Sequence, residues 1–349
     1  MDLFINMDYF VFSMDVPIVS PKVSVVMPVF NAGVYLHAAV ESVLSQSHTN
    51  LELIIVDDHS SDTAIQSLDK SDRRLKIIQN EGRGVVSAFN TGFLKCDGEF
   101  IARMDADDIS LEHRFIEQLQ YLNQNPGIDI AGCCVEIFSE HGIQGGLERY
   151  QAWLNSVREP QQVHRQIFIE SPLPNPSVMF RSSALAQLGG YRDVEWAEDY
   201  DMFLRADAMG LQMGKPEPVL LRWREHEKRL THTDIRYERD QFMRAKIHFL
   251  VFHRLRGRAV IIWGAGPTGQ QVHDLLVNDG AVVEGFIEVH PRRIGGSKRG
   301  LPVWAVEKCA QPELALILVA VGAAGARHEI SNFMIEKGLL EGEDYLFVA

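Results

Sequence analysis

Apolar runs and segments with apolar residues at helical spacing alternate along the first third of the chain. The apolar, β-branched runs predict strands at 22–31, 51–62, 75–80 and 98–108. Helices are predicted between them, at 33–46, 63–70 and 84–96. Strands that alternate with helices are typical of an α/β fold with a parallel sheet.

Polar and acidic residues follow three of these predicted strands. In parallel α/β sheets, ligands bind beyond the carboxyl ends of the strands. Because these ends share one edge, we expect segments 28–31, 57–60 and 105–108 to line one site. Asp57 and Asp58 are also common turn and helix-capping residues, so a purely local role for them stays open.

Three carboxylates lie close together in the third of these segments, at Asp105, Asp107 and Asp108. Neighbouring carboxylates repel each other, so a cation is expected to meet them. Carboxylate oxygens are hard ligands that suit Mg²⁺ or Mn²⁺. Proteins usually hold these ions with one or two carboxylates and the phosphates of a nucleotide. The pattern therefore predicts Mn²⁺ or Mg²⁺ between the chain and a nucleotide diphosphate.

A second alternation of strands and helices begins near residue 257. The segment "GRAVIIWGAGPTGQQVHDLL" predicts a strand, a turn with Gly264, Gly266 and Gly269, and a helix. The next strand, 281–288, ends at Glu288. This order predicts a half-size Rossmann-like domain that binds a nucleotide or nucleotide-sugar through these glycines and Glu288. Glycines that serve only close packing are the alternative.

The remaining elements of this part follow the same pattern. They are a strand at 315–322, a helix at 325–337 and a final strand in "DYLFV". The part is too short for a complete dinucleotide-binding dehydrogenase, because it holds little more than one mononucleotide half.

Length, charge and cysteine content limit the classes of function. The chain has 349 residues. A single hydrophobic core usually supports fewer residues than this, so the length favours two domains. The formal net charge of -13 argues against a nucleic-acid-binding protein. The four cysteines, Cys96, Cys133, Cys134 and Cys309, form no CxxC pair, so a reduced, cytoplasmic protein is expected.

The first 21 residues are interpreted as an N-terminal extension. They are apolar, but Asp2, Asp8 and Asp15 interrupt them and no basic segment precedes them. They are therefore a poor signal peptide and a poor transmembrane helix.

Basic residues are concentrated at 222–258, although the rest of the chain is acidic. A helix at 235–253 would carry Ile235, Phe242 and Ile247 as apolar anchors. A basic amphipathic helix can lie on an anionic membrane, and contact through 235–258 would place the protein at the inner face. The favoured alternative is a connecting helix, 235–256, packed between the domains.

Several ordered motifs resemble the inverting family 2 glycosyltransferases of GT-A fold. They are "VSVVMPVFNAGVYLHAAVESVLSQSHTNLELIIVDDHSSD", "GRGVVSAFNTGFLKCDGEFIARMDADDISLEHRF", "PNPSVMFRSSALAQLGGYR", "WAEDYDMFLRADAMG" and "LLRWREHEKRLT". The resemblance covers about 22–235. It implies a mixed, mainly parallel α/β sheet and a nucleotide-sugar donor.

The resemblance assigns the nucleotide pocket to residues that follow the first strands. Pro28, Phe30 and Asn31 would line the base and ribose pocket. Asp58, with Asp57 beside it, would contact the base. Arg83 would approach the nucleotide from the loop before the helix at 84–96.

The same resemblance assigns the metal ligands and the general base of the reaction. Asp105 would face the ribose and the metal, Asp107 would bind the metal, and Asp108 is a weaker candidate. His226 would lie near the metal and the diphosphate. Asp199 would be the general base, with Glu198 as its neighbour and an acceptor contact.

Local alternatives stay open for three of these positions. Asp199 is also placed to complement a helix dipole, and His226 to be a solvated surface residue. Asn175 stands where the resemblance leads us to expect a histidine, which leaves a polar contact there in doubt.

The segment "GFIEVHPRRIGGSKRGLPVW" resembles the N-terminal domain of bacterial sugar acyltransferases, which contacts a nucleotide-sugar there. The chain has no hexapeptide repeats of a left-handed helix, so acyltransferase activity is not implied.

These observations predict an extension (1–21), a GT-A domain (22–234), a connecting helix (235–256) and a Rossmann-like domain (257–349). The predicted function is metal-dependent, inverting transfer of a sugar from an NDP-sugar, with UDP favoured. The acceptor would be a hydroxyl of a glycan or a lipid-linked molecule. Two alternatives are a non-catalytic nucleotide-sugar-binding protein and an oxidoreductase that acts through the C-terminal GxGxxG turn.

Overall fold

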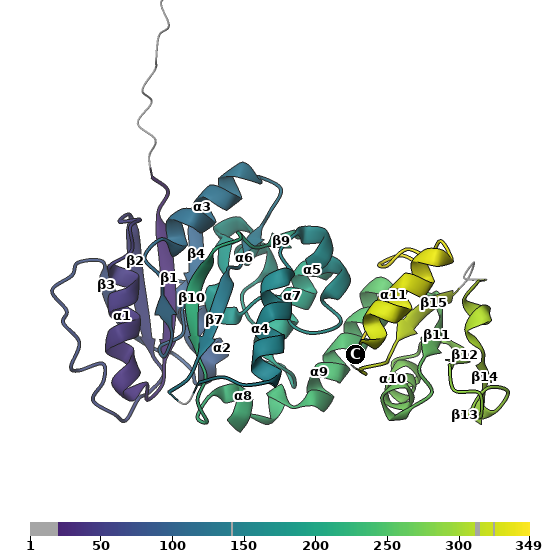
Figure 1. Cartoon of the computed structure of the whole chain (residues 1–349). Helices are drawn as coiled ribbons and strands as arrows, with labels where there is room; N and C mark the ends of the chain where they lie inside the picture. The colour runs from purple at the N-terminus through teal and green to yellow at the C-terminus, as the bar shows by residue number, and fades with distance from the viewer. Residues whose placement is uncertain (1–19, 141, 311–314, 324) are drawn as a thin grey trace, which may run out of the picture.

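The computed structural model describes residues 20–140, 142–310, 315–323 and 325–349. Most of the predicted N-terminal extension, residues 1–19, lies outside this description. Two large sheets lie side by side and the helix α9 (Arg239–Phe249) runs between them (Figure 1).

The first sheet has seven strands in the order β3-β2-β1-β4-β8-β6-β9. They are β1 (Val23–Val29), β2 (Leu51–Asp57), β3 (Leu75–Gln79), β4 (Phe100–Arg103), β6 (Ile130–Ala131), β8 (Met179–Arg181) and β9 (Met213–Gly214). The first four are parallel, and β8 pairs antiparallel with β4 and β6. The four strands predicted at the N-terminal end are thus present and form the parallel half of a mixed sheet.

The alternation of side chains along β1 divides the core into two layers. Val23, Val25 and Met27 pack with the helices α1 (Leu36–Leu44) and α3 (Arg114–Gln124). Val26 points to the opposite face, toward α2 (Gly84–Phe93). A Cβ on Gly92 of α2 would lie 2.5 Å from the Val26 Cγ1, so glycine permits the close approach of helix and strand.

The predicted helix at 63–70 is absent, and this segment forms turns. The Asp62 carboxylate accepts hydrogen bonds from the Gly33 and Ala64 backbone N–H groups. A single helical turn follows, in which the Ser67 N–H donates to the Thr63 carbonyl. The side chain of Asp62 is therefore engaged in joining two loops, and the short segment does not propagate into a helix.

A second, three-stranded sheet and several helices complete the N-terminal half. The strands are β5 (Ile109–Ser110), β10 (Val219–Arg224) and β7 (Cys134–Phe138), in the order β5-β10-β7. The helices are α4 (Gly146–Ser156), α5 (Pro160–Gln166), α6 (Ser182–Leu188), α7 (Glu198–Ala208) and α8 (Leu230–Thr233). Short 3-10 helices are η1 (Gly33–Tyr35), η2 (Asn175–Ser177) and η3 (Ile235–Tyr237).

The C-terminal sheet has the order β13-β14-β12-β11-β15-β16. Its strands are β11 (Ala259–Trp263), β12 (Val283–Ile287), β13 (Ser297–Lys298), β14 (Leu301–Trp304), β15 (Ala315–Val319) and β16 (Tyr345–Phe347). All neighbours are parallel except β13 and β14. Its helices are α10 (Pro267–Asn278), α11 (Ala326–Glu336) and the 3-10 helix η5 (Val306–Ala310).

Helix α9 contacts α7 of the first half and α10 of the second. Its residues Met243, Ile247 and Phe249 are buried in a core cluster that includes side chains of both halves. A π-helix, η4 (Leu250–Arg254), continues it toward β11. Helix α9 thus lies within the segment 235–256, and the role of that segment as a connection between domains and its contact with a membrane both stay predictions. Within the described residues, no helix is long and apolar enough to cross a bilayer.

Candidate active site

The ends of β1 and β2 are joined by the side chain of Asn31. Its Oδ1 accepts hydrogen bonds from the backbone N–H groups of Ser61 (2.7 Å) and Asp62 (3.2 Å). Asn31 has a φ of 49°, a left-handed conformation that asparagine adopts more readily than most residues. Two of the three predicted strand ends therefore meet at one edge, and Phe30 beside them is 63% exposed.

Asp57 and Asp58 both have hydrogen-bond partners within the chain. Asp57 Oδ1 accepts from the Ser60 N–H at 2.8 Å. Asp58 accepts from Asn80 Nδ2 at 2.6 Å and from the Gly84 N–H at 2.8 Å. Asp58 thereby ties the loop that carries the exposed Arg83 to the end of β2. Contacts of these residues with a nucleotide base stay predictions.

The three carboxylates after β4 have three different environments. Asp105 Oδ1 accepts from Arg103 Nε at 3.1 Å, and Asp107 Oδ2 lies 2.8 Å from His226 Nε2. Asp108 is almost fully buried, and its Oδ1 accepts from the Arg224 N–H at 2.7 Å. Its Oδ2 has no partner. Burial and the neighbouring charges of Asp107 and Asp105 raise the pKa of Asp108 well above its usual value.

The donor set fits a divalent ion only in part. Asp107 and His226 already face each other, and one or two protein ligands with substrate phosphates is the usual arrangement for Mg²⁺ or Mn²⁺. Asp105 is directed to Arg103 instead. In the part of the chain that the structure describes, no three His, Cys, Asp or Glu side chains form a ready ligand group. Of the predicted ligands, Asp107 and His226 thus lie together, whereas the Asp105 carboxylate is bonded to Arg103.

Arg224 holds the acidic loop and was not among the predicted site residues. Its Nε donates to the Asp107 carbonyl at 2.7 Å. Its guanidinium lies 4.3 Å from the ring centre of Tyr35 and 4.5 Å from that of Phe138. Tyr35 also lies beside the His226 ring. These contacts join residues that are distant in sequence, so no local pattern predicts them.

Asp199 and Glu198 begin helix α7. Asp199 is half-buried, and its Oδ1 accepts from the Tyr200 N–H at 2.7 Å. Burial, and then the charge of Glu198, raise the pKa of Asp199 to about 7. Glu198 is almost fully buried, and its Oε2 accepts from the Tyr237 hydroxyl at 2.6 Å. A carboxylate with a pKa near neutrality is suited to accept a proton at neutral pH.

Arg103 connects the acidic loop with the start of α7. It is buried, stacks 5.2 Å from the ring centre of Tyr191, and its Nη1 has no hydrogen-bond partner. Burial acts to lower its pKa, but the charges of Asp105 and Glu198 outweigh that effect and raise it. Arg103 is therefore a permanently charged group between the two predicted halves of the site, and sequence reasoning missed it.

Asp201 was also missed, although it lies two residues after the predicted base. It is fully buried and pairs with Arg205 at 2.7 Å and with Arg192 at 2.6 Å. The Trp196 Nε1 donates to the same carboxylate. These contacts fix the first turn of α7 to the preceding loop and thereby orient Asp199.

Asn175 retains a polar contact at the position where a histidine was expected. Its Oδ1 accepts from the Tyr191 hydroxyl at 2.5 Å, and both side chains are buried. Tyr191 in turn stacks against Arg103. Asn175 therefore supports the same buried cluster that lies under the acidic loop.

The glycine turn of the C-terminal sheet follows β11 and opens α10, as the spacing predicts. Gly264 has a φ of 117°, and a Cβ on Gly269 would lie 1.8 Å from the Gly264 carbonyl oxygen. Glu288 accepts from the Val289 N–H and from Arg293 Nη1, both at 2.9 Å. The packing alternative therefore explains Gly269 directly, and nucleotide binding at Gly264, Gly266, Gly269 and Glu288 stays a prediction.

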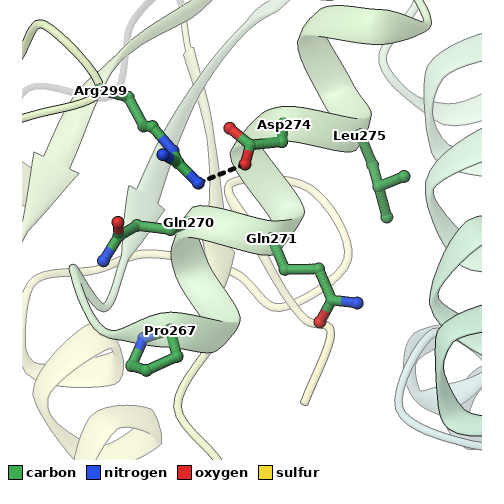
Figure 2. A pocket seen from close by; sticks show the side chains of 6 residues that line it. All are labelled: Pro267, Gln270, Gln271, Asp274, Leu275 and Arg299. Carbon is green, nitrogen blue, oxygen red and sulfur yellow. Dashed lines mark hydrogen bonds and ion pairs between the residues drawn. The ribbon is translucent and has the colours of Figure 1, made fainter.

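A cavity of about 470 Å³ lies along α10. It is lined by Pro267, Gln270, Gln271, Asp274, Leu275 and Arg299. Figure 2 shows the Arg299 guanidinium, from the turn between β13 and β14, reaching the Asp274 carboxylate on the helix. None of the acidic residues that follow β4 lines it.

Comparisons with known proteins agree with one another. The model of glycosyl transferase family 2 matches residues 24–189. The putative glycosyltransferase EpsE of Bacillus subtilis is 31% identical over 229 residues, 63% of this chain and 79% of EpsE. The O-antigen biosynthesis glycosyltransferase WbnJ of Escherichia coli is 26% identical over 223 residues, 62% of this chain and 84% of WbnJ.

Among solved structures, TarS of S. aureus in complex with UDP-GlcNAc has a TM-score of 0.55 and 17% identity to this chain. The match covers 74% of this chain and 71% of that one. At this level of identity the likeness concerns the fold. The predicted GT-A fold, with a mixed and mainly parallel sheet, is confirmed.

Proposed function

The chain belongs to glycosyl transferase family 2, and from that premise we propose that it moves a sugar from a UDP-sugar to a hydroxyl with inversion. The observation that carries the mechanism is the environment of Asp199, a half-buried carboxylate whose pKa is raised to about 7. At neutral pH a large fraction of such a group is ionised and still has a high proton affinity. Asp199 would accept the proton of the attacking hydroxyl.

Charge on the leaving diphosphate would be neutralised at the acidic loop. Asp107 and His226 are the residues that would hold a divalent ion, and the oxygen donor suits Mn²⁺ or Mg²⁺. When bound, the ion would offset the negative charge that develops on the diphosphate. The imidazole is a softer ligand than a carboxylate, which favours Mn²⁺ over Mg²⁺.

Residues at the ends of β1 and β2 would bind the nucleotide. Asn31 and Asp58 hold the two loops in place, which leaves Phe30 and Arg83 exposed beside them. Phe30 offers an aromatic face to a base, and Arg83 a cation to a phosphate. Pro28 lies in β1 opposite Val56 and would form the floor of this pocket.

The acceptor would be a glycan or a lipid-linked saccharide. WbnJ is by name an O-antigen biosynthesis enzyme, and the similar AmsE of Erwinia amylovora an amylovoran biosynthesis enzyme. Tyr150 of α4 lies close to Trp223 of β10, and Arg229 stacks on Trp223. Such aromatic faces suit the apolar faces of sugar rings. If the acceptor is lipid-linked, we expect the enzyme to act at the cytoplasmic face of the membrane.

The test is donor hydrolysis over a panel of nucleotide-sugars that includes UDP-GlcNAc, with Mn²⁺, Mg²⁺ or EDTA. We expect release of one nucleotide that depends on the metal and is lost in Asp107→Ala. Release that continues unchanged in EDTA would contradict the metal-dependent mechanism. No release or binding with any donor would favour the non-catalytic alternative.

The C-terminal sheet would be an accessory unit that binds a nucleotide-sugar or a partner. The oxidoreductase alternative requires this unit to bind a nicotinamide cofactor. Titration of the full chain with NADH and with the donor found above separates these roles. Binding of NADH with no donor turnover would favour the oxidoreductase.

A further inference from the structure

The segment that follows the transferase motifs returns to the start of α7. Tyr237, the last residue of η3, donates its hydroxyl to Glu198 Oε2 at 2.6 Å. Glu198 directly precedes the proposed base, Asp199, and lies outside the residues matched by the family model. A contact between residues 39 positions apart thus reaches the proposed catalytic carboxylate.

Other contacts hold η3 in the position that this hydrogen bond requires. The Asp234 side chain caps η3 by accepting from the Arg236 N–H at 2.9 Å. The Arg236 guanidinium reaches back to Asp193 at 3.3 Å, in the loop before α7. Two consecutive residues of η3, Arg236 and Tyr237, therefore hold both ends of the segment that leads into the helix.

Among the described residues, Glu198 accepts a hydrogen bond from the side chain of Tyr237. Its charge also acts on the pKa of two arginines, the buried Arg103 and Arg236 of η3. A buried carboxylate needs such partners to offset the loss of contact with water. The hydrogen bond from Tyr237 therefore holds the almost fully buried Glu198 carboxylate in place beside Asp199.

We propose that Tyr237 is a positioning residue that fixes the Glu198 carboxylate beside Asp199 and thereby governs when Asp199 accepts a proton. The proposal rests on Asp199 as the base of the proposed function. The like charge of Glu198 is one of the causes that raise the pKa of Asp199, after burial. The titratable and charged groups that surround Asp199 are Glu198 of α7, Arg103 of β4, Asp105 of the acidic loop, Tyr150 of α4, Tyr191 before α7, and Tyr237 of η3.

The sign of the effect follows from the electrostatics. Glu198→Gln removes a like charge, so Asp199 should lose its proton at lower pH. Tyr237→Phe removes the hydrogen bond that holds the Glu198 carboxylate, which can then turn away from Asp199 and repel it less. Both variants should therefore lower the titration midpoint of Asp199. If Tyr237 acts through Glu198 alone, adding Tyr237→Phe to Glu198→Gln should cause no further change.

The experiment is a pH titration of the ligand-free full chain by carboxyl ¹³C NMR, with the Asp199 signal assigned from Asp199→Asn. We expect Glu198→Gln to lower the midpoint by about one pH unit or more, as for strongly interacting pairs. Tyr237→Phe should lower it by less, and the double variant should match Glu198→Gln. The control is Tyr121→Phe. This variant removes a tyrosine hydroxyl of α3 that lies outside the site and has no hydrogen-bond partner among the described residues.

Two results would overturn the proposal. One is an unchanged Asp199 midpoint in Tyr237→Phe, and the other is an additive shift in the double variant. Because the titration needs no substrate, it tests this arrangement even if no donor is turned over. Where a donor is turned over, the acid limb of kcat/KM should move with the NMR midpoint in each variant, and a limb that stays in place would contradict the role of Asp199 as the base.

Discussion

The Nε2 of His226 lies 2.8 Å from the Oδ2 of Asp107, a residue 119 positions earlier in the chain. Both side chains are partly buried, with 21% and 28% of their surfaces exposed. Arg224 strengthens the same junction, because its side chain donates to the carbonyl of Asp107. The segment after β10 thus forms one wall of the acidic loop, and metal binding by His226 stays a prediction.

His226→Ala should lower the affinity of the protein for its metal ion. If His226 and Asp107 hold the ion together, loss of the imidazole leaves one side-chain ligand of the pair. We expect the Mn²⁺ concentration for half-maximal donor hydrolysis to rise at least about 10-fold. The matched control is His232→Ala, because His232 is 50% exposed and pairs with Glu225 instead. Equal metal dependence in the two variants would exclude His226 as a ligand.

Asp199→Asn should slow the transfer reaction strongly while leaving donor binding intact. The amide cannot accept a proton, so kcat should fall by roughly 10²- to 10⁴-fold. The amide oxygen can still accept the hydrogen bond from the Tyr200 N–H, which preserves the start of α7. The measurement is kcat and the donor dissociation constant, with Asp97→Asn as control, because the Asp97 side chain is 66% exposed. A variant with wild-type kcat would remove Asp199 from the mechanism.

The same variant should change how stability depends on pH. The pKa of Asp199 is about 7 in the folded chain and about 4 when unfolded, so the folded state binds the extra proton between these values. The wild-type protein therefore loses stability as the pH rises from 4 to 7. Asp199→Asn should be more stable than wild type by about 1–3 kcal/mol at pH 8 and similar to it at pH 4. Urea unfolding at the two pH values measures this difference.

The parallel half of the sheet could be predicted because its strands are continuous apolar runs. In β1 and β2 nearly every residue is buried, and such runs are readable from sequence alone. The predicted helix at 63–70 failed because so short a segment gains little from helix propagation, and the Asp62 side chain before it is bonded to the Gly33 N–H of a distant loop. Such a contact depends on a partner that is distant in sequence.

The candidate site could be predicted only where motifs are contiguous. Asp107 and Asp199 could be proposed as site residues because each lies in a recognisable acidic segment, and their roles stay predictions. Arg103, Asp201 and Tyr237 were missed, because each acts through partners that only the fold brings near. Nothing in the local sequence separates a buried arginine such as Arg103 from one at the surface.

Asp201→Ala should destabilise the protein strongly. The carboxylate is fully buried, and its removal leaves Arg192 and Arg205 without their common partner. Loss of one member of a buried ion pair costs about 3–5 kcal/mol. Urea unfolding should detect this loss, whereas Asp193→Ala, at a residue whose side chain is 84% exposed, should change stability by about 0.5 kcal/mol or less. Similar values for the two variants would show that the network contributes little.

Two glycines of the C-terminal turn separate packing from nucleotide binding. A Cβ on Gly269 would lie 1.8 Å from the Gly264 carbonyl oxygen, whereas one on Gly266 would meet nothing within 4 Å. Gly269→Ala should therefore cost about 1–3 kcal/mol or more, through overpacking against the backbone. Gly266→Ala should cost less than about 1 kcal/mol, because it changes only a helix N-cap.

The informative comparison is nucleotide binding by the stable variant, Gly266→Ala. If the turn holds a phosphate, a methyl group at its open side should block close approach of the ligand and weaken binding. A UDP-sugar is titrated into Asp107→Ala and into the double variant Asp107→Ala with Gly266→Ala. The difference between the two titrations measures binding at the C-terminal turn, because the acidic loop is altered in both. Residual binding that falls about 10-fold or more with the added alanine would support a second nucleotide site. Residual binding that does not change would assign these glycines to packing, because the contact of Gly269 with Gly264 then accounts for their spacing.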